Sequence, residues 1–344
     1  MTQPLLSVRN LRVEFDTRRA TLVALDDVSF DIMPGEILGV VGESGAGKSV
    51  TGAAIIGLIE PPGRIASGEI WLKGQRIDNL RPKDLQKIRG RRIGMVFQDP
   101  LTSLNPVIRI GAQIVETIRA HHDVGAAEAR ERAIALLAKV GIPAPASRID
   151  AYPHELSGGM RQRVVLALVL SAEPEPIIAD EPTTALDVSV QAQIIELLKS
   201  LARERGTAVM LITHDIGVIA ETADRVAVMY AGRIAEIGPV RSVLKTPHHP
   251  YTVGLMGAIP SLVSTRSGGQ LAQIPGSMPR LSAIPKGCAF NPRCMQVFDR
   301  CRSERPGLMT AGTGAGVTQA ACWLYADSGG VRPSGGDTGD TVLP

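Results

Sequence analysis

Apolar and polar residues alternate along the first part of the chain in a pattern that predicts strands. Residues 6–15 and 22–33 alternate imperfectly, and the second segment ends at a Pro34-Gly35 turn. The continuous apolar run at 37–41 predicts a strand buried on both faces. A glycine-rich turn and a helix through about Ile59 are expected to follow it.

The rest of the chain to about residue 238 continues the same alternation. The region from about 99 to 172 is mainly helical, with apolar stripes at 109–120 and 125–140, and another helix is expected over 188–205. Further strands are expected near Glu69 and at 92–97, 177–179, 208–213 and 226–230. Strands that alternate with helices indicate an α/β fold with a mostly parallel sheet, here interrupted by a helical insertion.

The character of the chain changes after Gly238. Prolines then recur often enough to exclude one long helix, at positions 247, 250, 260, 275, 279 and 285. The last stretch, 326–344, is rich in Gly, Ser, Asp and Pro, and we expect it to be disordered.

Composition narrows the function classes. The 344 residues suggest about two domains, and an apolar share of 44% is ample for a core. The net charge is only +3 and aromatic residues make up 3%, which argues against a nucleic acid as the principal partner. The chain contains no apolar run of about 18 residues, the length that would predict a membrane span. The N-terminal segment acquires charge too early for a signal peptide, so we expect a cytoplasmic protein.

A phosphate-binding loop is predicted between the strand at 37–41 and the next helix. The residues match the pattern G-x-x-x-x-G-K-[ST] and are Gly42, Glu43, Ser44, Gly45, Ala46, Gly47, Lys48 and Ser49, with Val50 next to them. Backbone N–H groups and the helix N-terminus would face the phosphates, Lys48 would reach the β- and γ-phosphates, and Ser49 would hold Mg²⁺. The alternative is a glycine-rich turn with a solvated lysine.

Two adjacent carboxylates, Asp180 and Glu181, end the apolar run that begins at Ile177. Asp180 can hold Mg²⁺ and Glu181 can polarise an attacking water. Such a pair also occurs on solvated helix caps. The phosphate-binding loop upstream favours the functional interpretation, because that kind of site needs an acid.

A third motif lies at 156–163, LSGGMRQR. Ser157 can cap the following helix, and Gly158 and Gly159 permit close approach to a phosphate. A helix cap alone would explain Ser-Gly-Gly, but it would not explain why the whole motif occurs together with Asp180 and Glu181 in this chain.

With these motifs the chain resembles the ATP-binding cassette (ABC) ATPases over residues 6–250. The resemblance implies that Asp180 binds Mg²⁺ and that Glu181 is the catalytic glutamate. It implies that Gln98 senses Mg²⁺ and nucleotide and couples to membrane subunits, and that His214 contacts the γ-phosphate. Ala185, Leu186 and Asp187 match the family's D-loop, and Phe15 falls where an aromatic ring stacks on adenine. Taken singly, Gln98, His214 and Phe15 could be a surface amide, a buried histidine and a core aromatic.

The resemblance also implies an assembly. Two cassettes close head to tail, so that Ser157 and Gly159 act on the ATP of the other subunit and a monomer is nearly inactive. ATP-driven closure and opening after hydrolysis then supply the stroke for transport.

Shorter strings resemble the oligopeptide/dipeptide permease branch of the family, which includes nickel importers. They are Met160 in LSGGMRQRV, DPLTSLNP at 99–106, HHPYT at 248–252 and the C-terminal cysteines. The expected fold is a cassette over 1–250, with a RecA-like parallel-sheet core, an N-terminal antiparallel β subdomain and a helical subdomain at about 99–172. An extension over 251–325 should follow.

The cysteines Cys288, Cys294, Cys301 and Cys322 have the spacing C-x5-C-x6-C-x20-C. This resembles a motif that holds a [4Fe–4S] cluster in some peptide-permease ATPases. Four thiolates also suit zinc, and reduced structural cysteines are a third alternative.

The function implied is an ATPase, a translocase subunit that couples ATP and Mg²⁺ to import of di- or oligopeptides. Its expected partners are two permease subunits, a second cassette (paralogue or self) and an extracytoplasmic solute-binding protein. It would lie peripherally on the cytoplasmic face of the inner (plasma) membrane. The alternatives are import of nickel or another small solute, and a soluble ABC ATPase of DNA repair or translation. A C-terminal metal-dependent sensor or docking module could accompany the ATPase.

Overall fold

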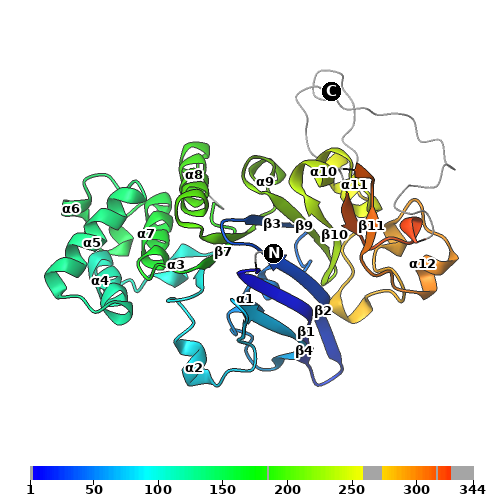
Figure 1. The fold of residues 1–344 in the computed structure, drawn as a ribbon, viewed down its shortest axis with the longest axis horizontal. Coiled ribbons are helices and arrows are strands. Elements are labelled where there is room, and N and C mark those ends of the chain that lie inside the picture. Colours follow the sequence, from blue (N-terminus) through cyan, green and yellow to red (C-terminus); the bar gives the residue numbers. More distant parts are fainter. Residues whose placement is uncertain (1–2, 184–185, 259–272, 315–316, 327–344) are drawn as a thin grey trace, which may run out of the picture. The chain divides into compact units, whose positions relative to one another are not determined.

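The computed structural model describes residues 3–183, 186–258, 273–314 and 317–326. They fall into two compact units that divide between Arg233 and Ile234 (Figure 1). The predicted disorder at 326–344 lies outside the described residues except for Ala326. Among the helices of the described part, none has the length and apolar character needed to cross a membrane.

The first unit begins with an antiparallel sheet of order β2-β1-β4-β5. Its strands are β1 (Leu6–Asp16), β2 (Thr21–Ile32), β4 (Gly63–Leu72) and β5 (Gln75–Arg76). β1 pairs with β2 on one side and β4 on the other, and its apolar residues Leu6, Val8, Leu11 and Val13 are all buried. The alternating patterns at 6–15 and 22–33 therefore form strands, as predicted.

A parallel sheet forms the core of the first unit, in the order β9-β3-β8-β7-β6. Its strands are β3 (Ile37–Val41), β6 (Gly94–Val96), β7 (Pro176–Asp180), β8 (Ala208–Ile212) and β9 (Arg225–Tyr230). Every residue of β3, β7 and β8 is buried. This burial confirms that their continuous apolar runs are strands covered on both faces.

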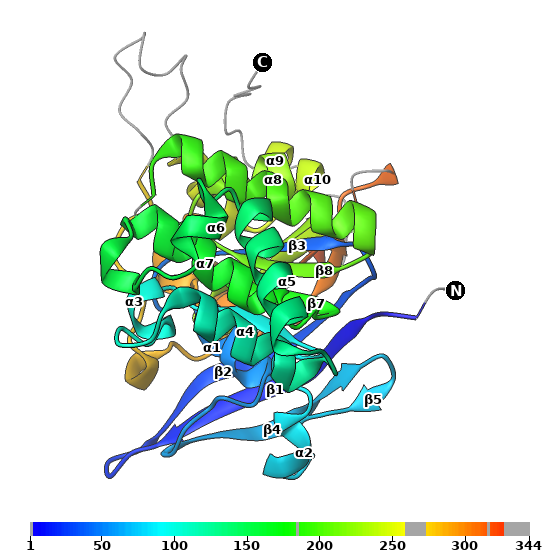
Figure 2. The same cartoon turned by 90° about the vertical axis from the view of Figure 1, so that its left-hand side faces the viewer.

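Helices cover both faces of this parallel sheet. α8 (Val188–Arg205) and α9 (Ile216–Thr222) lie on one face, and α1 (Lys48–Ile55) lies on the other, next to the antiparallel sheet (Figure 2). α1 ends at Ile55, earlier than the predicted Ile59. The reason is Gly57, whose φ of 68° leaves the right-handed helical region.

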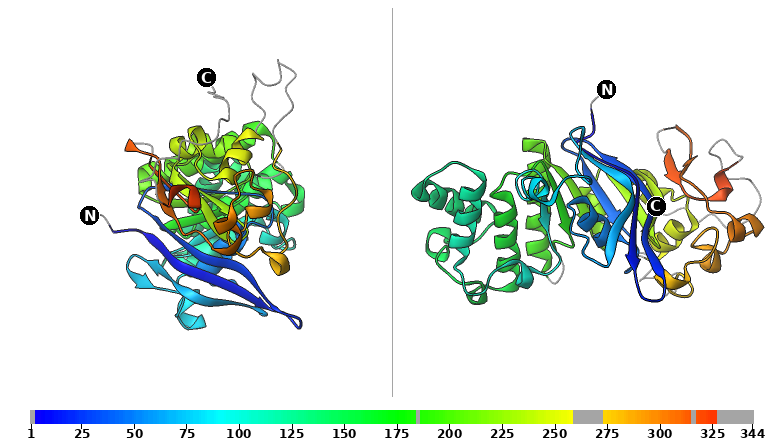
Figure 3. Two further views of the ribbon diagram at one scale, coloured as in Figure 1. Left: turned by 90° about the vertical axis from the view of Figure 1, so that its right-hand side faces the viewer. Right: turned by 90° about the horizontal axis from the view of Figure 1, so that it is seen from below.

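The stretch between β6 and β7 is helical, as predicted. Figure 3 (right) shows it, in cyan to green, as a cluster of helices beside the sheets. It contains α3 (Pro100–Ser103), α4 (Ile110–His121), α5 (Ala126–Lys139), α6 (Pro145–Arg148) and α7 (Gly158–Leu170). Buried residues at i, i+4 and i+8 join α4 to α5, with Ile110, Ile114 and Ile118 facing Ala129, Ala133 and Leu137. A short helix, α2 (Pro82–Gln86), precedes β6.

The second unit is built from short elements, and none of its described helices is long, in agreement with the prolines that exclude one long helix. They are β10 (Arg233–Pro239), α10 (Val240–Lys245), α11 (Pro250–Gly257), η2 (Leu281–Ala283), η3 (Asn291–Arg293), α12 (Asp299–Ser303), β11 (Met309–Ala311), β12 (Thr318–Ala320) and η5 (Trp323–Tyr325). β12 pairs antiparallel with both β10 and β11. Glu236, buried on β10, accepts hydrogen bonds from the backbone N–H groups of His248 and His249 and from the hydroxyl of Thr318 on β12.

Candidate active site

The loop between β3 and α1 has three glycines with a positive φ, and two of them, Gly42 and Gly47, are also closely packed. Gly42 has a φ of 151° and Gly47 a φ of 102°. A Cβ atom on Gly42 would lie 2.3 Å from the carbonyl oxygen of Met229, and one on Gly47 would lie 2.8 Å from Leu25 Cδ2. The loop is therefore packed tightly against the end of the sheet.

Lys48, the first residue of α1, folds back into this loop. Its Nζ donates to the carbonyl oxygens of Gly42, at 2.8 Å, and Glu43, at 3.1 Å. Burial lowers the pKa of Lys48, and the nearby charges of Glu181, Asp180 and Glu43 oppose that shift. A buried ammonium group held by backbone carbonyls is suited to binding phosphate oxygens.

Asp180 and Ser49 form the feature that fits a magnesium ion. Asp180 ends β7, is 4% exposed and accepts a hydrogen bond from the Ser49 hydroxyl. Its Oδ1 atom is buried and has no hydrogen-bond partner in the described part of the chain. Burial raises the pKa of Asp180, Glu181 raises it further, and Ser49 and Lys48 oppose the rise. A hydroxyl and an unsatisfied carboxylate oxygen are hard donors of the kind that Mg²⁺ takes together with phosphate oxygens.

Glu181 is the centre of a small hydrogen-bonded group. Its Oε2 accepts from Gln98 Nε2 at 3.0 Å, and its Oε1 lies 3.3 Å from His214 Nδ1. The backbone of Glu181 has a φ of 48°, which is rare outside glycine and recurs at functional sites. The Glu181 side chain is 16% exposed and that of His214 67%, so the group opens to solvent on one side.

The order of the parallel strands explains this meeting of distant residues. Gln98, Glu181 and His214 follow β6, β7 and β8, which are neighbours in the sheet. Parallel strands end at the same edge, so the residues after them converge. The phosphate-binding loop, which follows β3, opens at the same edge because β3 pairs with β8.

The Ser-Gly-Gly motif begins α7 at an exposed place. Ser157 caps the helix by accepting from Met160 N at 3.3 Å, and a Cβ atom on Gly158 would have nothing within 4 Å. The N-terminal N–H groups of α7 can therefore donate hydrogen bonds to an anion. For the described residues, no hydrogen bond or ion pair joins Ser157, Gly158 or Gly159 to the phosphate-binding loop.

Asp187 begins α8 next to this motif. Its carboxylate accepts from Val190 N at 2.9 Å, and that hydrogen bond with the one from Ser189 lowers its pKa. A Cβ atom on Gly159 would contact Val190 and Leu186. Ala185 lies outside the described residues.

Two other expected nucleotide residues have ordinary surroundings. Phe15 is half-buried on β1, paired with Leu22 and Gly63, and its ring lies where a Cβ atom of Gly63 would be. Val50 is half-buried in the first turn of α1. Neither position tests the expected contact with nucleotide.

One contact near the site was missed in the sequence. Asp215, directly after His214, caps α9 and accepts from Gln191 Nε2 at 3.2 Å. It thereby joins the His214 loop to α8, the helix that Asp187 begins. An Asp before an apolar helix is a recognisable N-cap, but nothing in the sequence indicates Gln191 as its partner.

The site combines a phosphate-binding loop with a carboxylate pair. A separate helical insertion adds a helix that begins at an exposed Ser-Gly-Gly. Together these features define the ATP-binding cassette class of P-loop ATPases. The family model described as ABC transporter matches residues 25–184, and the model for the oligopeptide/dipeptide transporter C-terminal region matches residues 235–301. The chain belongs to the peptide-transporter ATP-binding subunits of the ABC family, and it is an ATPase of the kind coupled to transmembrane transport.

Individual relatives agree with this assignment. The chain is 45% identical to the dipeptide transport ATP-binding protein DppD of Escherichia coli, over 96% of this chain and 99% of that protein. It is 46% identical to the dipeptide transport ATP-binding protein DppD of Bacillus subtilis, over 94% of this chain and 95% of that protein. Among solved structures, the dimeric ATP-binding cassette MJ0796 bound to ADP and Pi is similar, with a TM-score of 0.63 and 29% identity, over 69% of this chain and 99% of that one. The predicted cassette fold is confirmed.

Proposed function

We propose that this protein is the ATP-hydrolysing, energy-coupling subunit of an importer of di- or oligopeptides. The single observation that carries the hydrolytic role is Glu181, held between Gln98 and His214 beside Lys48 and the Ser49–Asp180 pair. The peptide substrate is supported by the near full-length similarity to dipeptide transport subunits and by the matched C-terminal region. Those similarities do not favour a nickel importer or a soluble ABC ATPase.

Each residue of the site has a role that follows from its surroundings. Lys48 and the loop N–H groups would bind the β- and γ-phosphates. Ser49 and Asp180 would hold Mg²⁺, which would neutralise phosphate charge. Glu181 accepts a proton from the attacking water. Gln98 and His214 orient the Glu181 carboxylate through both of its oxygens, and His214 can then turn a ring nitrogen to the γ-phosphate.

A second cassette is needed to complete the site. Ser157, Gly158 and Gly159 present a free helix start that nothing in the described part of their own chain uses as a phosphate site. Val188, directly after Asp187, is 84% exposed, as expected for a residue that another subunit covers. We infer that two cassettes pair, each supplying α7 to the other's ATP. The partner cassette is a paralogue or a second copy.

The residues around Gln98 support docking on permease subunits. Phe97 is 41% exposed, Val107 78% and Ile108 36%, so apolar side chains surround the start of the helical insertion. A membrane subunit that covers them would contact the segment bearing Gln98 and so sense the state of Glu181. We propose a complex with two permease subunits and an extracytoplasmic binding protein, with this chain peripheral on the cytoplasmic face of the inner membrane.

The cysteines support a second, separate proposal for the second unit. Cys288, Cys294, Cys301 and Cys322 line one cavity. Burial raises the pKa of Cys288 to about 11 and that of Cys322 to about 12, and the neighbouring thiols add to both shifts. Within the described ranges, no group of three or more His, Cys, Asp or Glu side chains is placed to hold a single metal ion. We propose that these four cysteines hold an iron–sulfur cluster, because all four line this one cavity.

Iron and acid-labile sulfide in anaerobically purified protein test the cluster. Cys301→Ser should lose both. A wild-type protein without iron and sulfide would reject the proposal.

Glu181→Gln tests the proposed function. In complex with its permeases, the variant should bind ATP normally while kcat falls at least about 100-fold, because the base is lost. Glu204→Gln, an exposed acid on α8 outside the site, is the matched control and should keep the wild-type rate.

Pull-down of tagged Glu181→Gln with ATP–Mg²⁺ should recover permease subunits. The ATPase activity of the wild-type complex should be stimulated by binding protein loaded with dipeptide, but not by binding protein loaded with Ni²⁺. Unchanged turnover in Glu181→Gln would refute the catalytic assignment. Stimulation by Ni²⁺ instead of dipeptide would refute the substrate.

A further inference from the structure

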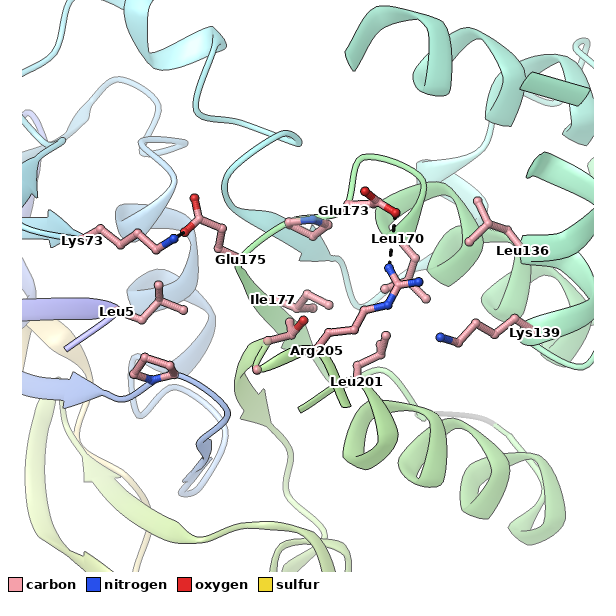
Figure 4. Close-up of a pocket in the computed structure, with 14 residues that line it drawn as sticks. Leu5, Lys73, Leu136, Lys139, Leu170, Glu173, Glu175, Ile177, Leu201 and Arg205 are labelled. Atoms are coloured by element: carbon pink, nitrogen blue, oxygen red, sulfur yellow. Dashed lines mark hydrogen bonds and ion pairs between the residues drawn. The ribbon is translucent and has the colours of Figure 1, made fainter. Parts of the chain in front are cut away.

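A second cavity lies in the first unit, at the edge of the parallel sheet opposite to the ATP site. It has a volume of about 460 Å³ and adjoins the beginnings of β7 and β8, near Ile177 and Thr207 (Figure 4). Glu181 and His214 follow the other ends of these strands. The volume falls in the range of small-molecule sites, about 300–1,000 Å³. The cavity is therefore large enough for an organic ligand that leaves the nucleotide site free.

The floor of the cavity is apolar and comes from distant parts of the chain. Leu5 precedes β1, Leu136 lies on α5, Leu170 ends α7, and Leu201 lies on α8. Leu5, Leu170 and Leu201 are at most 7% exposed, so the floor is a continuation of the core. An apolar ligand body on this floor would contact the antiparallel sheet, the parallel-sheet core and the helical insertion at once.

The acids at the rim already have cationic partners. Glu175 forms ion pairs with Lys73 and, at 3.2 Å, with Arg92, and these partners outweigh the effect of burial to lower its pKa. Glu173 lies 3.4 Å from Arg205. Each rim carboxylate therefore has a cation beside it, but the long Glu173–Arg205 contact leaves Arg205 able to bind a second anion.

Two cations at the rim point toward one another. Lys139, at the end of α5, and Arg205, at the end of α8, converge from opposite sides of the cavity (Figure 4). Lys139 has no ion pair or hydrogen bond with any described residue, and Arg205 has only the single 3.4 Å contact with Glu173. Converging like charges repel unless an anion lies between them. The place between Lys139 and Arg205 therefore favours a negatively charged group.

We propose that this cavity is a second ligand site that binds a small organic anion, a carboxylate with an apolar body. The carboxylate lies between Lys139 and Arg205, and the apolar body lies on the leucine floor. Because the floor joins α5 and α7 to the start of β7, an occupied site holds the helical insertion, which carries Ser157, against the core. The ligand thus favours one arrangement of the cassette and modulates turnover without competing with ATP.

The site can be tested on the full chain with 8-anilinonaphthalene-1-sulfonate, an anion with an aromatic body that fluoresces in apolar cavities. A saturating non-hydrolysable ATP analogue with Mg²⁺ keeps the nucleotide site occupied. We expect saturable binding of one dye per chain. Octanoate should displace the dye, whereas octylammonium, with the same apolar tail and the opposite charge, should not.

Variants place the binding at this cavity. Lys139→Glu should weaken dye and octanoate binding about tenfold or more, since a charge-assisted contact is lost and a repulsive one gained. Lys139→Gln removes the charge, adds no negative one and leaves a polar side chain one atom shorter, so it should weaken binding less. Arg132→Glu makes the same charge change two turns earlier on α5, away from the cavity, and should bind as wild type.

Displacement by octylammonium as strong as by octanoate would overturn the proposal. So would equal affinities for Lys139→Glu and Arg132→Glu, or loss of dye binding with the ATP analogue. Circular dichroism melts of each variant show whether it is folded. If Lys139→Glu does not fold, Lys139→Gln is compared with wild type in its place.

Discussion

Alanine at Gly42 should destabilise the protein much more than alanine at Gly45 or Gly158, although all three glycines belong to the expected nucleotide-binding motifs. At Gly158 the new methyl group meets nothing within 4 Å and φ is not positive, so little should change. At Gly45 there is also space, but φ is 83°. The left-handed conformation alone costs a non-glycine residue about 1–2 kcal/mol. At Gly42 the unfavourable φ of 151° is joined by a contact of 2.3 Å with the Met229 carbonyl oxygen.

The Gly42 penalty can be built from its two parts. Backbone strain contributes about 1–3 kcal/mol and overpacking about the same again, so the free energy of unfolding should fall by about 4 kcal/mol. For a domain of this size, each kcal/mol lowers the Tm by about 2–4 °C. We therefore expect Tm losses of about 8–16 °C for Gly42→Ala and about 3–6 °C for Gly45→Ala, with Gly158→Ala within about 1 °C of wild type.

Thermal melts followed by circular dichroism without nucleotide measure these shifts. Gly42→Ala and Gly45→Ala with equal Tm values would refute the steric part of the reasoning. A loss for Gly158→Ala as large as that for Gly45→Ala would refute the conformational part. Gly158→Ala should be stable but should still reduce ATPase activity if α7 closes on the partner's ATP. A loss of activity without a loss of stability would separate a functional role of Gly158 from a structural one.

Three further predictions concern contacts around the site and in the second unit. Gln98→Leu removes the 3.0 Å hydrogen bond to Glu181 and should lower kcat about tenfold or more with little change in ATP affinity, measured as steady-state ATPase rate and nucleotide binding. Gln191→Leu breaks the 3.2 Å contact with Asp215 and should lower kcat severalfold while the Tm changes by only a few °C; an unchanged rate would show that the contact does not position His214. Glu236→Gln should destabilise the second unit, and the effect should depend on pH. Burial raises the pKa of Glu236, but hydrogen bonds from His248 and His249 outweigh it and lower the pKa below 4.5. The stabilisation from ionised Glu236 is thus present above the unfolded-state value and is lost as pH falls through the folded-state value, so urea unfolding of wild type and variant should differ at pH 7 and converge toward pH 3. A constant difference across that range would contradict the assignment.

Local patterns predicted most of the elements because burial acts on each of them directly. The runs ending at Val41 and Asp180 are strands because β-branched and aliphatic residues follow one another in a length suited to a strand and not to a helix. The boundary of α1 was the exception. The helix stops at Ile55, since Gly57 takes a left-handed conformation with the Leu85 side chain packed where its Cβ would be.

The site divides in the same way. Lys48, Ser49, Asp180 and Glu181 stand in short motifs whose spacing alone predicts their chemistry. The contact between Gln191 and Asp215 has no such signal, because it joins two helices whose packing depends on the sheet beneath them. No sequence pattern predicts the cavity lined by Leu5, Leu136 and Lys139 either, since Leu5 lies more than a hundred residues from the other two in the chain.

The sequence by itself determined the class of fold, the phosphate-binding loop, the acid pair and the family resemblance, because each depends on residues close together in the chain. Only the tertiary structure decided that Glu181 is held by both Gln98 and His214, and that Lys139 faces Arg205. The physical reason is the order β8-β7-β6 of the parallel strands. It is set by pairing between distant segments, and it brings together the side chains at one edge of the sheet and the cavity walls at the other.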